Sequence, residues 1–108
     1  MNEKYNGWTN YETWLTALWF LDWHLTGADF LTDEEIEEAA QARTEYDFYR
    51  IAGRLAERVR DQVEEFRELE SNCSGLFSDL LNAALSRVDW ADIANAWLSD
   101  LVEEVRTK

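Results

Sequence analysis

Few residues in this 108-residue chain carry side chains suited to catalysis, since it holds one histidine and one cysteine. A general base or metal ligand at His24 would need a carboxylate on its own side of a helix, yet Asp22, two residues away, falls on the opposite flank. Cys73 has only that one histidine to activate it and sits among small polar residues, as a plain loop cysteine does. The isolated glycines form no phosphate-binding loop. We therefore expect no enzyme activity, no metal site and no cofactor.

Carboxylates are the distinctive chemical groups, since 23 Asp and Glu against 10 Lys and Arg give a net charge of -13. The first dense group spans about 9 Å of helix rise with five carboxylates. Duplex DNA presents about five phosphates over that length, at one per roughly 1.7 Å. The charge density thus matches that of nucleic acid. The acidic residues predicted to bind a partner are Asp33, Glu34, Glu35, Glu37 and Glu38 in this first group and Glu64, Glu65 and Glu68 in a second.

The acidic composition has two readings. An acidic surface repels nucleic acid but attracts basic proteins, including those that bind nucleic acid. Acid at a helix start also stabilises the helix alone, and the arginines at 50, 54, 58 and 60 are ordinary ion-pair partners along the next helix. Simple solubility or a salt-adapted proteome would give the same charge. Sequence leaves both readings open.

The apolar spacing and the absence of proline predict helices throughout. We expect helices over residues 10–25, 33–43, 44–70, 76–85 and 90–105, with a break near 43–45 and a loop at 71–75. No segment alternates with the period of a strand. The chain is therefore predicted to form one domain, residues 1–108, folded as an all-α, compact bundle of four to five helices.

Helix boundaries follow from capping patterns. Thr9 with Glu12 and Thr32 with Glu35 each form a capping-box pattern, and Asp89 precedes the last helix. Gly27 is expected to end the first helix. Gly53, inside a helix, is expected to have a packing reason such as the close approach of a tryptophan.

Four of the six tryptophans fall between Gly7 and Trp23. At roughly 100° per residue the predicted buried stripe of this helix is Tyr11, Trp14, Leu15, Leu18, Leu21 and Leu25, widened by Trp19. Asp22 falls within that arc and would need a partner if buried. Phe20 and Trp23 lie outside it and are interpreted as aromatics that contact another part of the fold or another chain. Trp14, Trp90 and Trp97 are predicted core residues, and we expect the two tryptophan-bearing ends to pack together.

Two blocks of sequence resemble a family of small proteins found on phages and other mobile elements. Residues 5–14 contain N-Y-E-T-W, and residues 77–94 resemble D-L-L-N-A-A-L-S-x-V-x-W-x-x-I-A. The resemblance brings no established activity, but it implies a setting in which small proteins commonly act on host machinery or host defence. Because the matched residues are mostly apolar and capping types, we expect both blocks to determine the fold.

These observations together favour a phage or mobile-element protein that inhibits a host nucleic-acid-handling defence system, such as a CRISPR effector or a restriction enzyme. It would do so by occupying the basic site of that host protein as a decoy, without contacting nucleic acid or a membrane. The alternative is a helical adaptor or homodimeric structural module that binds through exposed Phe20 and Trp23. The N-terminus lacks a signal-peptide pattern and no run of eighteen apolar residues occurs. We therefore expect the protein in the host cytoplasm.

Overall fold

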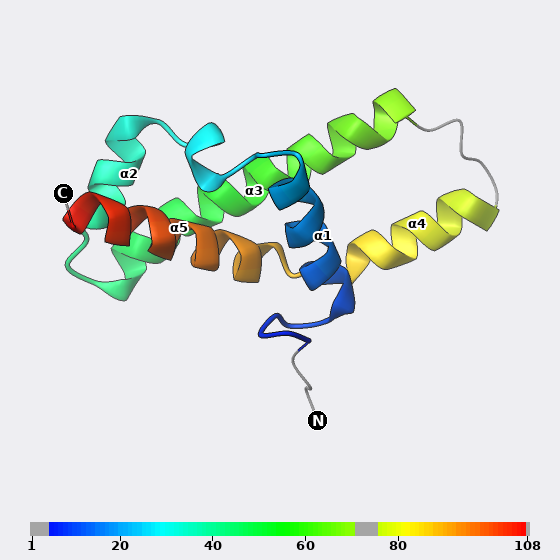
Figure 1. The fold of residues 1–108 in the computed structure, drawn as a ribbon, viewed down its shortest axis with the longest axis horizontal. Coiled ribbons are helices and arrows are strands. Elements are labelled where there is room, and N and C mark those ends of the chain that lie inside the picture. The colour runs from blue at the N-terminus through cyan, green and yellow to red at the C-terminus, as the bar shows by residue number, and fades with distance from the viewer. Residues whose placement is uncertain (1–4, 71–75, 108) are drawn as a thin grey trace.

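Five α-helices and one short 3-10 turn make up most of the computed structural model (Figure 1). The structure describes the backbone of residues 5–70 and 76–107 and the side chains of 5–67 and 79–107. The elements are α1 (Tyr11–Asp22), η1 (Gly27–Asp29), α2 (Asp33–Ala40), α3 (Glu45–Glu70), α4 (Leu76–Ser86) and α5 (Trp90–Arg106). No strand occurs among the described residues, so the predicted all-α bundle is confirmed. The expected loop at 71–75, with Cys73, lies outside the described residues.

The long helix α3 is the base on which the other elements pack (Figure 1). α5 lies along its first half, and α2 closes over the end of both helices. Their apolar sides meet in one main core, to which α1 contributes a single fully buried side chain. The buried members of this core are Phe20, Leu31, Ile36, Ala39, Ile51, Ala52, Leu55, Val59, Ala94, Leu98 and Val102.

The predicted break between α2 and α3 is confirmed. α2 ends at Ala40 and α3 begins at Glu45, where the Thr44 hydroxyl accepts a hydrogen bond from the Asp47 N–H at 3.2 Å. Arg106, in the last turn of α5, donates to the Ala40 carbonyl at 3.0 Å. A cation therefore satisfies an orphan carbonyl at the end of α2, where the helix dipole favours it.

Both ends of α1 differ from the prediction. Asn10, rather than Thr9, caps the start, because its side-chain carbonyl accepts the Thr13 N–H at 2.9 Å. The helix ends before Gly27, with His24 in the left-handed region at φ 60°. The N–H groups of His24 and Leu25 donate to the carbonyls of Leu21 and Phe20, each at 3.0 Å. This is a Schellman ending in which His24 takes the place usually held by glycine.

The buried side of α1 is opposite to the predicted one. Thr13, Ala17 and Phe20 face inward, and Phe20 is fully buried. Trp19 and Leu21 are 50% and 69% exposed, and Asp22 is also exposed, so it needs no partner. α1 is apolar on nearly every side, and periodicity could not choose between its faces. The small residues Thr13 and Ala17 decide it, because they let the helix approach its neighbours closely.

The glycine at 27, rather than the one at 53, has a packing reason. A Cβ atom at Gly27 would lie 2.9 Å from Leu101 Cδ1 and 3.3 Å from Trp97 Cβ, so a side chain here would force Leu101 or η1 to move. A Cβ atom at Gly53 would have no atom within 4 Å. The predicted approach of a tryptophan to Gly53 is therefore wrong.

The two tryptophan-bearing ends of the chain do pack together. Trp8, Trp90 and Trp97 surround a second small core of Ala17, Val88 and Ile93. Trp14 is only half-buried and lies against Tyr5 and Tyr11, with ring centroids 5.1 Å and 5.7 Å away. Its predicted place in the core is therefore wrong.

A network of hydrogen bonds, which we term the polar clasp, joins the two motif blocks. Its members are Thr9, Asn10, Glu12, Thr13, Arg87, Asp89 and Asp92. The fully buried Thr13 hydroxyl accepts the Asp89 N–H at 2.8 Å and donates to Asn10 at 2.7 Å. Asn10 also donates to the Arg87 carbonyl at 2.7 Å, and Arg87 pairs with Glu12 at 3.1 Å. The clasp therefore gives both motif blocks a structural role.

Candidate functional site

Four of the five acidic residues predicted on the second helix lie on the surface of α2. Asp33, Glu34, Glu37 and Glu38 are exposed. They form two pairs, 33 with 37 and 34 with 38, and the members of each pair are one helical turn apart. The Thr32 capping box places them there, with the Glu35 N–H donating to Thr32 at 3.1 Å and Glu35 accepting from the Thr32 N–H at 3.0 Å. Arg50 forms an ion pair with Glu38. The other three exposed residues form no ion pair with a described residue.

Glu35 is not part of this surface, which corrects the prediction. Its side chain turns inward and is 11% exposed. It accepts from Arg58 Nη1 at 2.6 Å and lies 3.4 Å from Arg54. The Arg58 hydrogen bond, aided by the Thr32 N–H and opposed by burial, lowers the pKa of Glu35 to about 2. The same carboxylate raises the pKa of Arg58. Glu35 therefore joins α2 to α3, because a capping carboxylate on the inner side of α2 cannot also face solvent.

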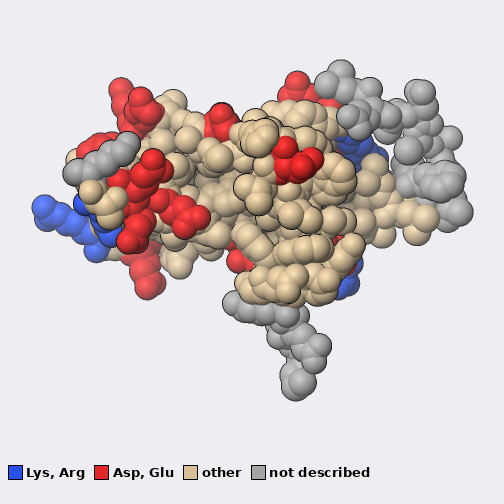
Figure 2. Space-filling model, in the orientation of Figure 1, with Lys and Arg blue, Asp and Glu red and all other residues tan. Residues whose placement is uncertain are grey.

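The C-terminal half of α5 adds carboxylates beside α2 that are not among the predicted site residues. Asp100, Glu103 and Glu104 are exposed and form no ion pair with a described residue. Glu104 lines one hollow with Asp33 and Glu37 of α2. Figure 2 shows acidic side chains gathered over the end of the molecule where α2 and α5 meet. We term the six residues the acidic face: Asp33, Glu34, Glu37, Asp100, Glu103 and Glu104.

The second predicted acidic group does not join the first. Glu64 and Glu65 are exposed on the last third of α3, which extends away from α2 (Figure 1). Arg67 lies 3.6 Å from Glu64 on the same helix. The side chain of Glu68 lies outside the described residues. The two groups are at opposite ends of a 26-residue helix and its partner α2, so they form no continuous acidic strip.

Of the two aromatic residues predicted to bind a partner in the alternative hypothesis, only Trp23 is exposed. Phe20, predicted to be exposed, is fully buried because it points from α1 into the main core, where Trp97 and Phe30 contact its ring. Trp23 is 44% exposed, and its ring lies 5.8 Å from Trp19 and 4.9 Å from Phe66. The exposed aromatics near the C-terminal end of α1 are therefore Trp19 and Trp23, beside exposed Leu18 and Leu21.

Of the histidine and the cysteine considered for catalysis, only His24 lies among the described residues, because Cys73 lies outside them. His24 is exposed at the end of α1, and its side chain makes no hydrogen bond with a described residue. No group of three or more His, Cys, Asp and Glu in the described ranges 5–67 and 79–107 is arranged to hold a metal ion. Within these ranges no helix is both long enough and apolar enough to cross a membrane.

Fold and surface together define a small all-α acidic protein with an acidic face at one end and exposed aromatics on α1. The chain belongs to DUF7249, a family of unknown function, whose model matches residues 1–105. Comparison with curated proteins and with solved structures gives no match.

Proposed function

We propose that this protein inhibits a host nucleic-acid-handling defence protein, such as a CRISPR effector or a restriction enzyme, by occupying its basic nucleic-acid site. The observation that carries the proposal is the acidic face, where α2 and α5 place six exposed carboxylates without a described ion-pair partner. The phage or mobile-element setting rests on the resemblance of the two motif blocks.

The physical basis is competition for cations. Lys and Arg side chains that bind phosphates also bind carboxylates, and a surface of matching charge density gains the same long-range attraction. Glu35 is buried and Glu38 is paired with Arg50, so α2 supplies three carboxylates to the acidic face, and α5 supplies three more. The decoy is therefore a surface built from two helices rather than one charged helix.

A test neutralises carboxylates without changing the shape of the molecule. The variant Asp33→Asn, Glu34→Gln, Glu37→Gln removes three charges from the acidic face. Its matched control, Asp61→Asn, Glu64→Gln, Glu65→Gln, removes three from the far part of α3. We expect the α2 variant to bind a partner captured from host cells about tenfold or more weakly, with a shallower dependence on salt.

The control should bind like the parent chain, and both variants should keep the parent's circular dichroism. An equal loss of affinity for the partner in the two variants would mean that binding depends only on the net charge of the chain. No loss in the α2 variant would contradict the proposal.

The exposed apolar side of α1 favours a second candidate, an adaptor or homodimer. The apolar side chains of this surface are each 43% to 69% exposed, and they are Leu18, Trp19, Leu21 and Trp23. Binding through this surface would be insensitive to salt, and homodimerisation would make the mass seen by light scattering rise with concentration. These two readouts separate it from the decoy.

A further inference from the structure

An apolar groove runs along α5 into the acidic face. Its first part, about 490 Å³, lies between α5, η1 and the end of α1, and its second part, about 340 Å³, lies between α5 and α2. Both parts are lined by Ala28, Leu101 and Glu104, so they lie next to each other. Its apolar lining includes Trp97, Leu101 and Val105, which span about 12 Å of helix rise.

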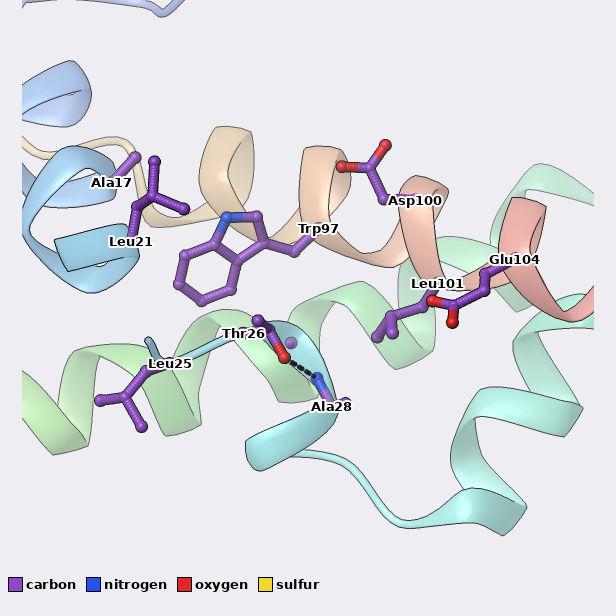
Figure 3. A pocket seen from close by; sticks show the side chains of 10 residues that line it. Ala17, Leu21, Leu25, Thr26, Ala28, Trp97, Asp100, Leu101 and Glu104 are labelled. Carbon is purple, nitrogen blue, oxygen red and sulfur yellow. Dashed lines mark hydrogen bonds between the residues drawn. The ribbon is translucent and has the colours of Figure 1, made fainter. Parts of the chain in front are cut away.

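Figure 3 shows how the first part is built. Trp97 of α5 lies across its middle, with Leu21 and Ala17 of α1 on one side and Leu101 on the other. Stacking against Phe30 at 6.4 Å and an edge contact with Phe20 at 5.4 Å hold the Trp97 ring in place. Gly27 keeps η1 close to α5, so the floor is fixed by packing on two sides.

Carboxylates follow this apolar floor along its length. Asp100 and Glu104 of α5 line the first part, and Asp33 and Glu37 of α2 join Glu104 in the second. Phosphate would be repelled by this lining, and a purely apolar ligand would leave the carboxylates without partners. A ligand that satisfies both features has an apolar stripe flanked by cations.

We propose that this groove binds an amphipathic helix whose apolar stripe is flanked by Lys or Arg. Anchors spaced i, i+3, i+4 and i+7 span about 10 Å and would lie on Trp97 and Leu101, as helices do in apolar grooves. The flanking cations face Asp100 and Glu104 on one helix and Asp33 and Glu37 on the other. A second copy of this chain is disfavoured as the occupant, because each copy carries a net charge of -13. The inference rests on the proposed function in that it specifies the chemistry of its basic partner.

The test uses a fluorescent helical peptide of Leu and Lys with that anchor spacing, and a scrambled peptide of equal composition. Ala28→Trp fills the groove without altering a charge, because Ala28 is exposed and lines both parts. Ala83→Trp, at an exposed position on α4, is its matched control. At 150 mM salt we expect the amphipathic peptide to bind Ala28→Trp about tenfold more weakly than it binds the parent chain. We expect the scrambled peptide to bind the parent chain about tenfold more weakly than the amphipathic peptide does. In the parent chain the peptide should shift the Trp97 indole N–H resonance.

Several outcomes would contradict the proposal that this groove binds an amphipathic helix. One such outcome is equal binding of the two peptides. Another is an unchanged affinity of the amphipathic peptide for an Ala28→Trp variant with native circular dichroism. Either result would mean that the peptide binds by non-specific charge attraction. A mass that rises with concentration in the parent but not in Ala28→Trp would make a second copy the occupant. The decoy is judged by separate experiments, in which the α2 carboxylates are neutralised and binding of the host partner is measured.

Discussion

At the scale of single residues, Glu35 has the most clearly defined role. It closes the capping box of α2 and accepts the short hydrogen bond from Arg58 of α3, so one carboxylate both starts a helix and fixes it to its neighbour. Arg58 also donates to the Phe30 carbonyl at 2.9 Å, which ties the segment before α2 to the same point. The charge that looked most like part of a binding surface therefore holds the fold together.

The pKa of Glu35 gives this role a pH dependence. Its value falls from 4.5 to about 2 on folding, so the ionised carboxylate stabilises the fold above about pH 4.5, and that contribution is lost as the pH falls toward 2. We expect Glu35→Gln to lower the free energy of unfolding by about 1–2 kcal/mol at pH 7, a figure reduced for the exposure of Arg58. Urea denaturation at several pH values measures this.

The difference between parent and Glu35→Gln should shrink steadily below about pH 4.5. Glu34→Gln, on the exposed side of α2, is the control and should leave stability nearly unchanged. A Glu35→Gln difference that stays constant down to pH 2 would show that the ion pair is not its cause.

At the scale of elements, the polar clasp explains why the N-terminal and C-terminal motifs occur together. Side chains at the start of α1 satisfy backbone groups of the turn before α5, because Asn10 donates to the Arg87 carbonyl and Thr13 accepts from the Asp89 N–H. α1 also packs into the two cores through Phe20 and Ala17. The clasp and these two contacts together position α1, and with it Leu21 beside Trp97.

Removing one hydroxyl tests the clasp. Thr13→Val keeps the shape of the side chain but leaves the Asp89 N–H without its acceptor, so we expect a loss of about 2 kcal/mol in the free energy of unfolding. Thr16→Val is the control, since the Thr16 hydroxyl only bonds the Glu12 carbonyl within the same helix. It should cost less than about 0.5 kcal/mol. Equal effects of the two substitutions in thermal or urea denaturation would argue against the clasp.

Elements with a clear apolar stripe or a local cap were predictable. The Thr32 capping box, the break before Glu45 and the start of α5 all follow from side-chain hydrogen bonds within four residues, which sequence spacing encodes directly. α1 was predictable as a helix but not in its orientation. A helix that is apolar all round has no stripe, and the burial of Phe20 depends on contacts with residues far along the chain.

At the scale of the whole molecule, the fold gathers charge that the sequence spreads over seventy residues. Asp33 and Glu104 line one hollow, although nothing in their local patterns relates them. The same packing separates Glu64 and Glu65 from α2, which the sequence could not show either. The composition indicated an acidic protein, but only the packing of α2 on α5 shows which carboxylates form one face.

Competition with DNA tests the decoy most directly. A host protein captured on this chain is bound to labelled duplex DNA, and the parent chain is then added while the anisotropy of the DNA is followed. We predict that the parent releases the DNA fully, that Asp33→Asn, Glu34→Gln, Glu37→Gln releases it about tenfold less effectively, and that the matched α3 variant acts like the parent. A stable complex containing the host protein, the DNA and this chain together would contradict the account.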